Sequence, residues 1–192
     1  MRDQIYQTGS GPSPFRFDAT VAAVFDDMIR RSVPGYELVL QQLTVLAKHY
    51  LSSGVLAYDL GCSIGASAVA MQCGASQGDT GEIIAVDNSA DMLTQAQVFV
   101  AQFADSTSKR RISLVEADLT QFDLRPSGMI SLNYVLQFLA PQERLALLQR
   151  CSDLLLPAYD KLQDDVGRFV ALGWRDPNLE GPSAPGGGGP VR

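Results

Sequence analysis

A glycine-rich turn between an apolar segment and a small-residue segment constrains the fold more than any other feature. In the stretch VLAYDLGCSIGASAVAM (residues 55–71), apolar and aromatic residues run into Asp59, and Gly61 and Gly65 follow before a small-residue segment. Glycines at a strand-to-helix turn let a ligand come close to the backbone, and the next helix N-terminus favours an anionic group. The stretch therefore predicts a nucleotide-binding α/β unit.

Strand and helix patterns alternate along most of the chain. Short links join them, which is typical of a doubly wound, mostly parallel sheet of the α/β class. We expect strands at residues 55–60, 82–87, 111–118 and 128–139, and helices at 18–31, 35–50, 66–72, 89–104 and 140–156. Asp18 is the expected cap of the first helix. The last helix should present Leu145, Leu148, Cys151 and Leu155 on one side.

The two ends of the chain differ in composition from its centre. Residues 1–16 contain TGSGPSP and are expected to form a flexible arm, followed by one domain over residues 17–156. Residues 157–192 hold one weak apolar patch at 166–174 and end in GPSAPGGGGPVR, which predicts a disordered tail. Further strands would normally follow residue 156, so we expect the sheet to lack its last strands and strand four to have an open edge.

Charge and residue counts exclude several classes of function. The formal net charge is −6, which disfavours tight contact with nucleic acid phosphates. No apolar run approaches the roughly 20 residues of a membrane span. A single histidine gives a zinc site or catalytic triad little to work with, and no metal is expected. Three cysteines without metal-site spacing fit a reducing cytoplasm.

Polar residues stand at the carboxyl ends of the four expected strands, where open α/β sheets bind ligands. Asp87 follows Gly65 at about the 20-residue offset of a ribose-binding carboxylate, although it could instead cap the next helix. Asp118 could read an adenine amino group or be a solvated loop residue. Asn133 could reach an amino-acid or sugar group, or satisfy backbone groups. Taken together they favour an S-adenosyl-L-methionine site. A dinucleotide site is disfavoured because Ala66 holds the third glycine position.

Four segments carry a more specific resemblance. VAAVFDDMIRRSVPGYELVL, YDLGCSIGAS, IIAVDNSADML and LNYVLQFLAPQER resemble the carboxy-S-adenosyl-L-methionine synthases, a bacterial family with the Rossmann-like class I methyltransferase fold. The resemblance covers roughly residues 17–157. It implies an enzyme that moves the carboxyl group released by prephenate onto the methyl carbon of S-adenosylmethionine, with phenylpyruvate as the other product. The carboxylated product serves a second enzyme in tRNA wobble uridine modification. A homodimer is implied as well.

The resemblance also implies site residues. Those expected to bind S-adenosylmethionine are Tyr36, Gly61, Cys62, Ser63, Asp87, Asn88, Asp118, Leu119 and Asn133. Arg31 stands where it could face prephenate, whose two carboxylates need arginines, but a surface salt bridge is the alternative. No catalytic residue is assigned.

The resemblance stops at Pro157. The family continues with further strands and an arginine that binds cofactor and substrate, and we expect this chain to be truncated or frameshifted there. Two alternatives to an active synthase therefore stay open. One is an ordinary S-adenosylmethionine-dependent methyltransferase, and the other is an inactive fold that at most binds the nucleotide.

Overall fold

A parallel sheet forms the centre of the protein. The computed structural model describes residues 18–51, 53–76, 78–156 and 170–172. The strand order is β3-β2-β1-β4-β5, and every pairing is parallel. The strands are β1 (Ala57–Leu60), β2 (Glu82–Asp87), β3 (Arg111–Glu116), β4 (Met129–Asn133) and β5 (Val170–Leu172). The α/β prediction with a parallel sheet is confirmed.

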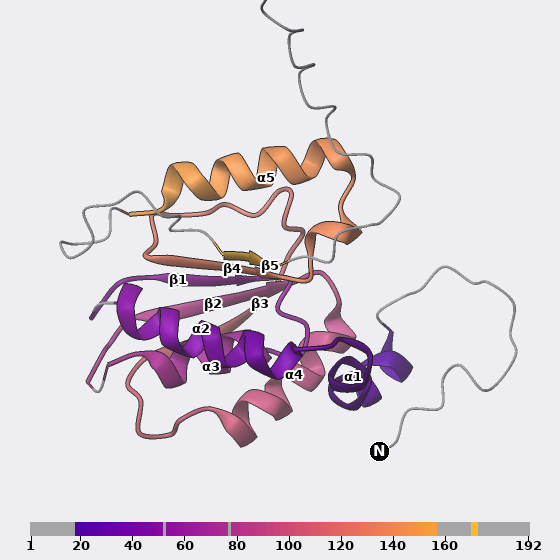
Figure 1. Ribbon diagram of the computed structural model, residues 1–192, viewed down its shortest axis with the longest axis horizontal. Coiled ribbons are helices and arrows are strands. Elements are labelled where there is room, and N and C mark those ends of the chain that lie inside the picture. Colours follow the sequence, from indigo (N-terminus) through magenta and orange to yellow (C-terminus); the bar gives the residue numbers. More distant parts are fainter. Residues whose placement is uncertain (1–17, 52, 77, 157–169, 173–192) are drawn as a thin grey trace, which may run out of the picture.

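Helices cover both faces of this sheet. Figure 1 shows α5 on one face and α2, α3 and α4 on the other. Their bounds are α1 (Ala19–Ser32), α2 (Tyr36–Tyr50), α3 (Ala66–Gly74), α4 (Ala90–Phe103), the 3₁₀ turn η2 (Leu136–Phe138) and α5 (Pro141–Leu154). As predicted, Asp18 caps α1, because its carboxylate accepts hydrogen bonds from the backbone of Thr20 and Val21. None of the helices in the described ranges is long and apolar enough to cross a membrane.

The strand residues alternate between two apolar layers. Ala57 and Ile83 pack with Leu43 and Met71 on the face covered by α2 and α3. Their strand neighbours pack on the α5 face with Leu147 and Cys151, and they include Tyr58, Leu60, Ile84, Val86, Ile130 and Leu132. Strands buried on both faces are the reason why 82–87 shows no polar alternation in the sequence.

Two details of the prediction are wrong. Strand four does not have an open edge throughout, since Val170–Leu172 pairs in parallel with residues 131–133 of β4. The rest of 157–192, like 1–17, lies outside the described residues. On α5, Cys151 is buried, and Leu148 and the C-cap residue Leu155 pack against the same apolar cluster, as expected, but Leu145 is 72% exposed and Leu147 is buried. The side of the helix that faces the sheet is therefore centred on Leu147 and Cys151 and leaves Leu145 outside it.

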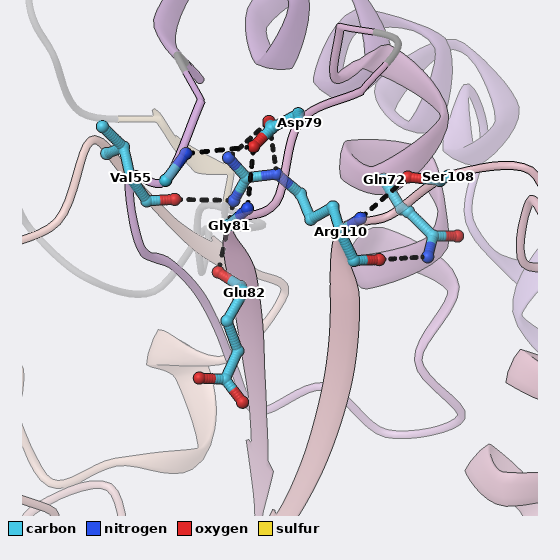
Figure 2. Close-up of polar contacts among 8 residues, drawn as sticks. Val55, Gln72, Asp79, Gly81, Glu82, Ser108 and Arg110 are labelled. Carbon is cyan, nitrogen blue, oxygen red and sulfur yellow. Dashed lines mark hydrogen bonds and ion pairs between the residues drawn. The ribbon is translucent and has the colours of Figure 1, made fainter.

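A buried ion pair ties together the amino ends of β1, β2 and β3 (Figure 2). The Arg110 guanidinium contacts Asp79 Oδ2 through Nε at 2.7 Å and Nη2 at 2.6 Å, and both side chains are fully buried. Arg110 Nη1 also donates to the Val55 carbonyl at 2.7 Å. Asp79 Oδ1 accepts from the backbone N–H groups of Gly54 and Gly81. The two charges therefore satisfy each other and the loop backbone around them.

Candidate functional site

A cavity of about 470 Å³ opens at the carboxyl ends of β1, β2, β3 and β4. One part of its lining is polar and comes from the strand ends. The other is mainly apolar and comes from α1, the segment after it, and the segment around η2. The lining residues are Phe25, Met28, Ile29, Ser32, Val33, Pro34, Gly61, Ser63, Asp87, Asn88, Asp118, Leu119, Tyr134, Val135, Gln137, Phe138 and Leu139. Six predicted site residues are among them.

The glycine turn is held against β2. The N–H groups of Gly61 and Cys62 both donate to the Val86 carbonyl, at 2.8 and 2.9 Å. Gly61 has a φ of +74°, and a Cβ atom there would overlap the side chain of Val135. Glycine is therefore required at this position by the neighbouring wall of the cavity as well as by its backbone conformation.

Asp87 links the glycine turn to the start of α4. Its Oδ2 accepts from the Ser63 N–H at 2.8 Å and its Oδ1 from the Ser89 N–H at 3.0 Å. Ser89 is the cap of α4, since its hydroxyl oxygen accepts from the Met92 N–H. Asp87 therefore does not cap the helix. Each of its oxygens keeps acceptor capacity toward the cavity.

Asp118 closes a short turn after β3. Its Oδ1 accepts from the N–H and the hydroxyl of Thr120, both at 2.8 Å. These hydrogen bonds hold the pKa of the Asp118 carboxyl below its usual range. The side chain is exposed at the cavity, beside the buried Leu119.

Unpaired acceptor atoms lie in the buried layer under α3. Asp59 on β1 stands opposite Ser131 on β4, and Asn133 lies two residues further along. Asp59 Oδ2 and Asn133 Oδ1 are buried and accept no hydrogen bond from the described residues. Asn133 Nδ2 donates to Ser67 Oγ. Burial raises the pKa of Asp59 to about 7, with the charge of Asp87 adding to the rise. Buried acceptors of this kind call for a hydrogen-bond donor.

The remaining predicted residues lie close to the cavity without lining it. Tyr36 is 5% exposed and its ring centroid is 6.3 Å from that of Tyr134. Cys62 is also 5% exposed. Burial raises the pKa of both the Tyr36 phenol and the Cys62 thiol.

Two residues other than glycine have positive φ among the described residues, and both line the cavity. They are Ser63 at +51° and Tyr134 at +58°. Such strain gathers at sites where the surrounding structure over-determines the backbone, as in ligand-binding turns.

Comparison with known proteins finds methyltransferases and carboxy-S-adenosyl-L-methionine synthases. A family model described as a methyltransferase domain matches residues 57–158. Carboxy-S-adenosyl-L-methionine synthase of Marinobacter nauticus is 40% identical over 157 residues, which is 82% of this chain and 61% of the relative. The enzyme of that name from Geobacter sp. strain M21 is 41% identical over 143 residues, 74% of this chain and 57% of the relative. The chain belongs to the methyltransferase-domain family, and the relatives that it matches at about 40% identity are named carboxy-S-adenosyl-L-methionine synthases.

Solved structures give the same fold. DesVI of Streptomyces venezuelae superposes with a TM-score of 0.53 at 19% identity, covering 75% of this chain and 56% of the other. Magnesium protoporphyrin IX methyltransferase of Synechocystis PCC 6803, with bound S-adenosylmethionine, has a TM-score of 0.51 at 17% identity, covering 77% and 62%. The chain therefore has the fold of S-adenosylmethionine-dependent methyltransferases. It spans about three fifths of the length of the curated relatives it matches.

Arg31 is exposed and paired rather than turned into the cavity. Its Nη1 contacts Asp27 Oδ2 at 3.1 Å, one turn back on α1, and it is not among the lining residues. This geometry is the surface salt bridge that the sequence left open as the alternative role of Arg31. A role for Arg31 toward substrate stays a prediction.

The apolar wall was missed at the sequence level. Phe25, Met28 and Ile29 lie on α1, more than 30 residues before the glycine turn, and Phe138 and Leu139 follow β4. Apolar residues at helical spacing in 18–31 are compatible with burial of this helix, but they do not indicate which surface it covers. One signal was present: the segment SVPGY, quoted for the resemblance, contributes Ser32, Val33 and Pro34 to the lining.

Proposed function

We propose that the cavity binds S-adenosylmethionine. One observation carries the proposal: residues from three successive strand ends, separated by up to 58 positions, line one cavity. They are Gly61, Ser63, Asp87, Asn88, Asp118 and Leu119, six of the nine positions that the family resemblance implies for this ligand. Their order along the sheet is that of the ligand-binding edge of an open α/β fold.

The polar groups fit the chemistry of this ligand. Its α-ammonium group is a donor and would satisfy the buried acceptors Asp59 Oδ2 and Asn133 Oδ1. The ribose hydroxyls would donate to Asp87, whose carboxylate is oriented by Ser63 and Ser89. Asp118 and the Leu119 backbone would take the adenine. The sulfonium group supplies a positive charge that makes its methyl carbon reactive, and the nearby carboxylates favour that charge.

On this basis we propose the reaction that the resemblance to the carboxy-S-adenosyl-L-methionine synthases implies. S-adenosylmethionine and prephenate give carboxy-S-adenosylmethionine, phenylpyruvate and water. The carbon–carbon bond between the prephenate ring and the carboxyl group attached to it breaks. The ring then loses its hydroxyl group and becomes aromatic. The carboxyl carbon forms a new bond to the methyl carbon of S-adenosylmethionine. The proton released by the methyl group and the hydroxide released by the ring form the water. The role of this chain's residues is to hold the methyl carbon in a cavity with an apolar wall of Phe25, Met28, Ile29, Phe138 and Leu139, which limits access of water.

Prephenate sets an electrostatic requirement. It carries two carboxylates, whereas the lining residues in the described ranges include Asp87 and Asp118 and no lysine, arginine or histidine. Cationic partners for prephenate would therefore have to come from residues that do not line the cavity in this structure, or from a second chain. The same observation favours a second candidate function, a fold that binds S-adenosylmethionine without turning over prephenate.

The wider setting is proposed from the resemblance. The product would feed an enzyme that carboxymethylates the wobble uridine of tRNA, in the cytoplasm, while this chain would act as a homodimer without touching the tRNA. The net charge of −6 is compatible with that division of labour.

Mass spectrometry of the purified chain with S-adenosylmethionine and prephenate tests the proposal. The expected result is carboxy-S-adenosylmethionine together with an equal amount of phenylpyruvate. Methyl transfer to an added acceptor would favour an ordinary methyltransferase. Binding of S-adenosylmethionine with no product would favour the second candidate, and no binding would refute the proposed site.

A further inference from the structure

An arginine on α5 holds the loop after β3 by its carbonyl groups. Arg150 Nη1 donates to the Thr120 carbonyl at 2.8 Å and to the Leu119 carbonyl at 3.4 Å. Its Nη2 donates to the Phe122 carbonyl. A single guanidinium thus binds three backbone acceptors within four residues, a match for its planar set of donors.

Packing against the sheet fixes both the helix that carries Arg150 and the loop that Arg150 binds. Its neighbours on α5, Leu147 and Cys151, are buried against the sheet, in the same apolar cluster as Leu119. Arg150 itself is only partly buried. The helix therefore provides a rigid base, and a charged donor bonded to carbonyls in a partly buried position is stronger than a neutral one.

The loop that Arg150 holds contains the two residues proposed to read the adenine. The N–H groups of Gln121 and Phe122 donate to the Asp118 carbonyl, at 3.1 and 2.8 Å, which folds the loop into a turn. Arg150 holds the other side of that turn. Asp118 and Leu119 line the cavity, whereas Arg150 does not.

We propose that Arg150 is a positioning residue for adenine recognition, which acts by fixing residues 118–122 from behind. The inference rests on the proposed function, since it takes the ligand of the cavity to be an adenosyl compound. It goes beyond that function because it assigns base selectivity to a side chain outside the cavity.

The test compares two ligands that differ at one position of the base. S-adenosylhomocysteine has an amino group at purine C6, a donor for the Asp118 carboxylate, and S-inosylhomocysteine has an oxygen there. Calorimetry gives the ratio of their affinities for the wild type and for Arg150→Met, which keeps an unbranched side chain. We expect the preference for the adenosyl ligand to fall roughly three- to tenfold, the effect of about one hydrogen bond. Loss of the Arg150 charge acts on both ligands alike and cancels in the ratio.

The control is Arg111→Met, which removes an equal charge at the amino end of β3. The Arg111 side chain is 77% exposed and contacts Glu82 at 3.3 Å, so the ratio should not change. If Arg150→Met does not fold, Arg150→Lys, which keeps the charge but loses the planar donors, should lower the ratio by a smaller factor. A Met or Lys variant that weakens both ligands equally, or neither, overturns the proposal.

Hydrogen exchange separates this proposal from the proposed function. If the wild type binds neither ligand, the proposed function fails, but the loop can still be measured in the free protein. Faster exchange of the Gln121 and Phe122 amides in Arg150→Met than in Arg111→Met would support positioning of the loop by Arg150. Equal exchange in the two variants would overturn it.

Discussion

The parallel strands all begin at one side of the sheet, here called the amino edge, and end at the other, the carboxyl edge. Each of these two edges has a fully buried aspartate, and the two aspartates differ in their hydrogen-bond partners. Asp79 and Asp59 are each 1% exposed. Asp79, at the amino edge, is bonded to the Arg110 guanidinium and to two backbone N–H groups (Figure 2). Asp59, at the carboxyl edge, has an oxygen without a partner among the described residues, and burial raises its pKa to about 7.

The difference separates a structural role from a binding role. A buried carboxylate with all of its partners in the protein stabilises the fold and has nothing left to offer a ligand. A buried carboxylate with an empty acceptor position is stabilised further by an incoming donor. The residues with strained backbone, Ser63 and Tyr134, also lie at the carboxyl edge. Burial alone would not have distinguished the two aspartates.

The largest effect is expected from breaking the amino-edge pair. Arg110→Met leaves the Asp79 charge buried without its cation, which should lower the free energy of unfolding by about 3–5 kcal/mol. Urea denaturation measures this, and Arg111→Met is the control, with a change within about 0.5 kcal/mol. A loss below about 1 kcal/mol in Arg110→Met would contradict the structural role of the pair.

The pH dependence of stability should reveal the unpaired carboxylate. The folded protein keeps the Asp59 proton up to about pH 7, whereas the unfolded chain releases it near pH 4. The folded state therefore binds more protons between these values, and the free energy of unfolding falls as the pH rises through that window. The fall due to Asp59 should be about 2–4 kcal/mol and should be absent in Asp59→Asn.

Urea denaturation of wild type and Asp59→Asn at pH 4.5, 6 and 8 checks this. The difference between the two proteins matters, because other groups titrate in both. If the difference in free energy of unfolding between wild type and Asp59→Asn does not change with pH, Asp59 is ionised in the folded protein over the whole range. Asp59 would then not be the unpaired buried carboxyl group described above.

A smaller effect is expected at the glycine turn. Gly61→Ala places a Cβ against Val135 at a φ of +74°, and should cost about 2–3 kcal/mol. Gly54→Ala is a matched control, since its φ is +78° but nothing lies within 4 Å of the new Cβ. It should cost about 1 kcal/mol. Adding Val135→Ala to Gly61→Ala should recover part of the loss, and thermal unfolding of the three variants would show whether it does.

The elements of the fold could be predicted from the sequence because their signals are local. The segment 82–87 is predicted and observed as a strand with the same bounds, and Asp18 as the cap of α1. Polar residues at strand ends are likewise local signals, which is why Asp87 and Asp118 could be placed at one edge before any contact was known.

The parts that could not be predicted depend on distant contacts. Arg110 and Asp79 are 31 residues apart with no local pattern that couples them, and the three carbonyls bound by Arg150 are about 30 residues away. Leu145 shares the expected side of α5 with Leu148 and Cys151, yet it is exposed while Leu147 is buried, because contact with the sheet decides which positions at the border of that side are covered. Pairing of Val170–Leu172 with β4 rests on a three-residue segment, too short to carry a strand signal of its own.

Calorimetric titration of S-adenosylmethionine tests the central claim, that the carboxyl edge of the sheet is the binding edge. The wild type should bind one ligand per cavity. Asp87→Ala should bind at least about tenfold more weakly, as expected for lost hydrogen bonds to a charged group, while Arg111→Met at the opposite edge should bind like the wild type. No binding by the folded wild type, or equal binding by Asp87→Ala, would contradict the account.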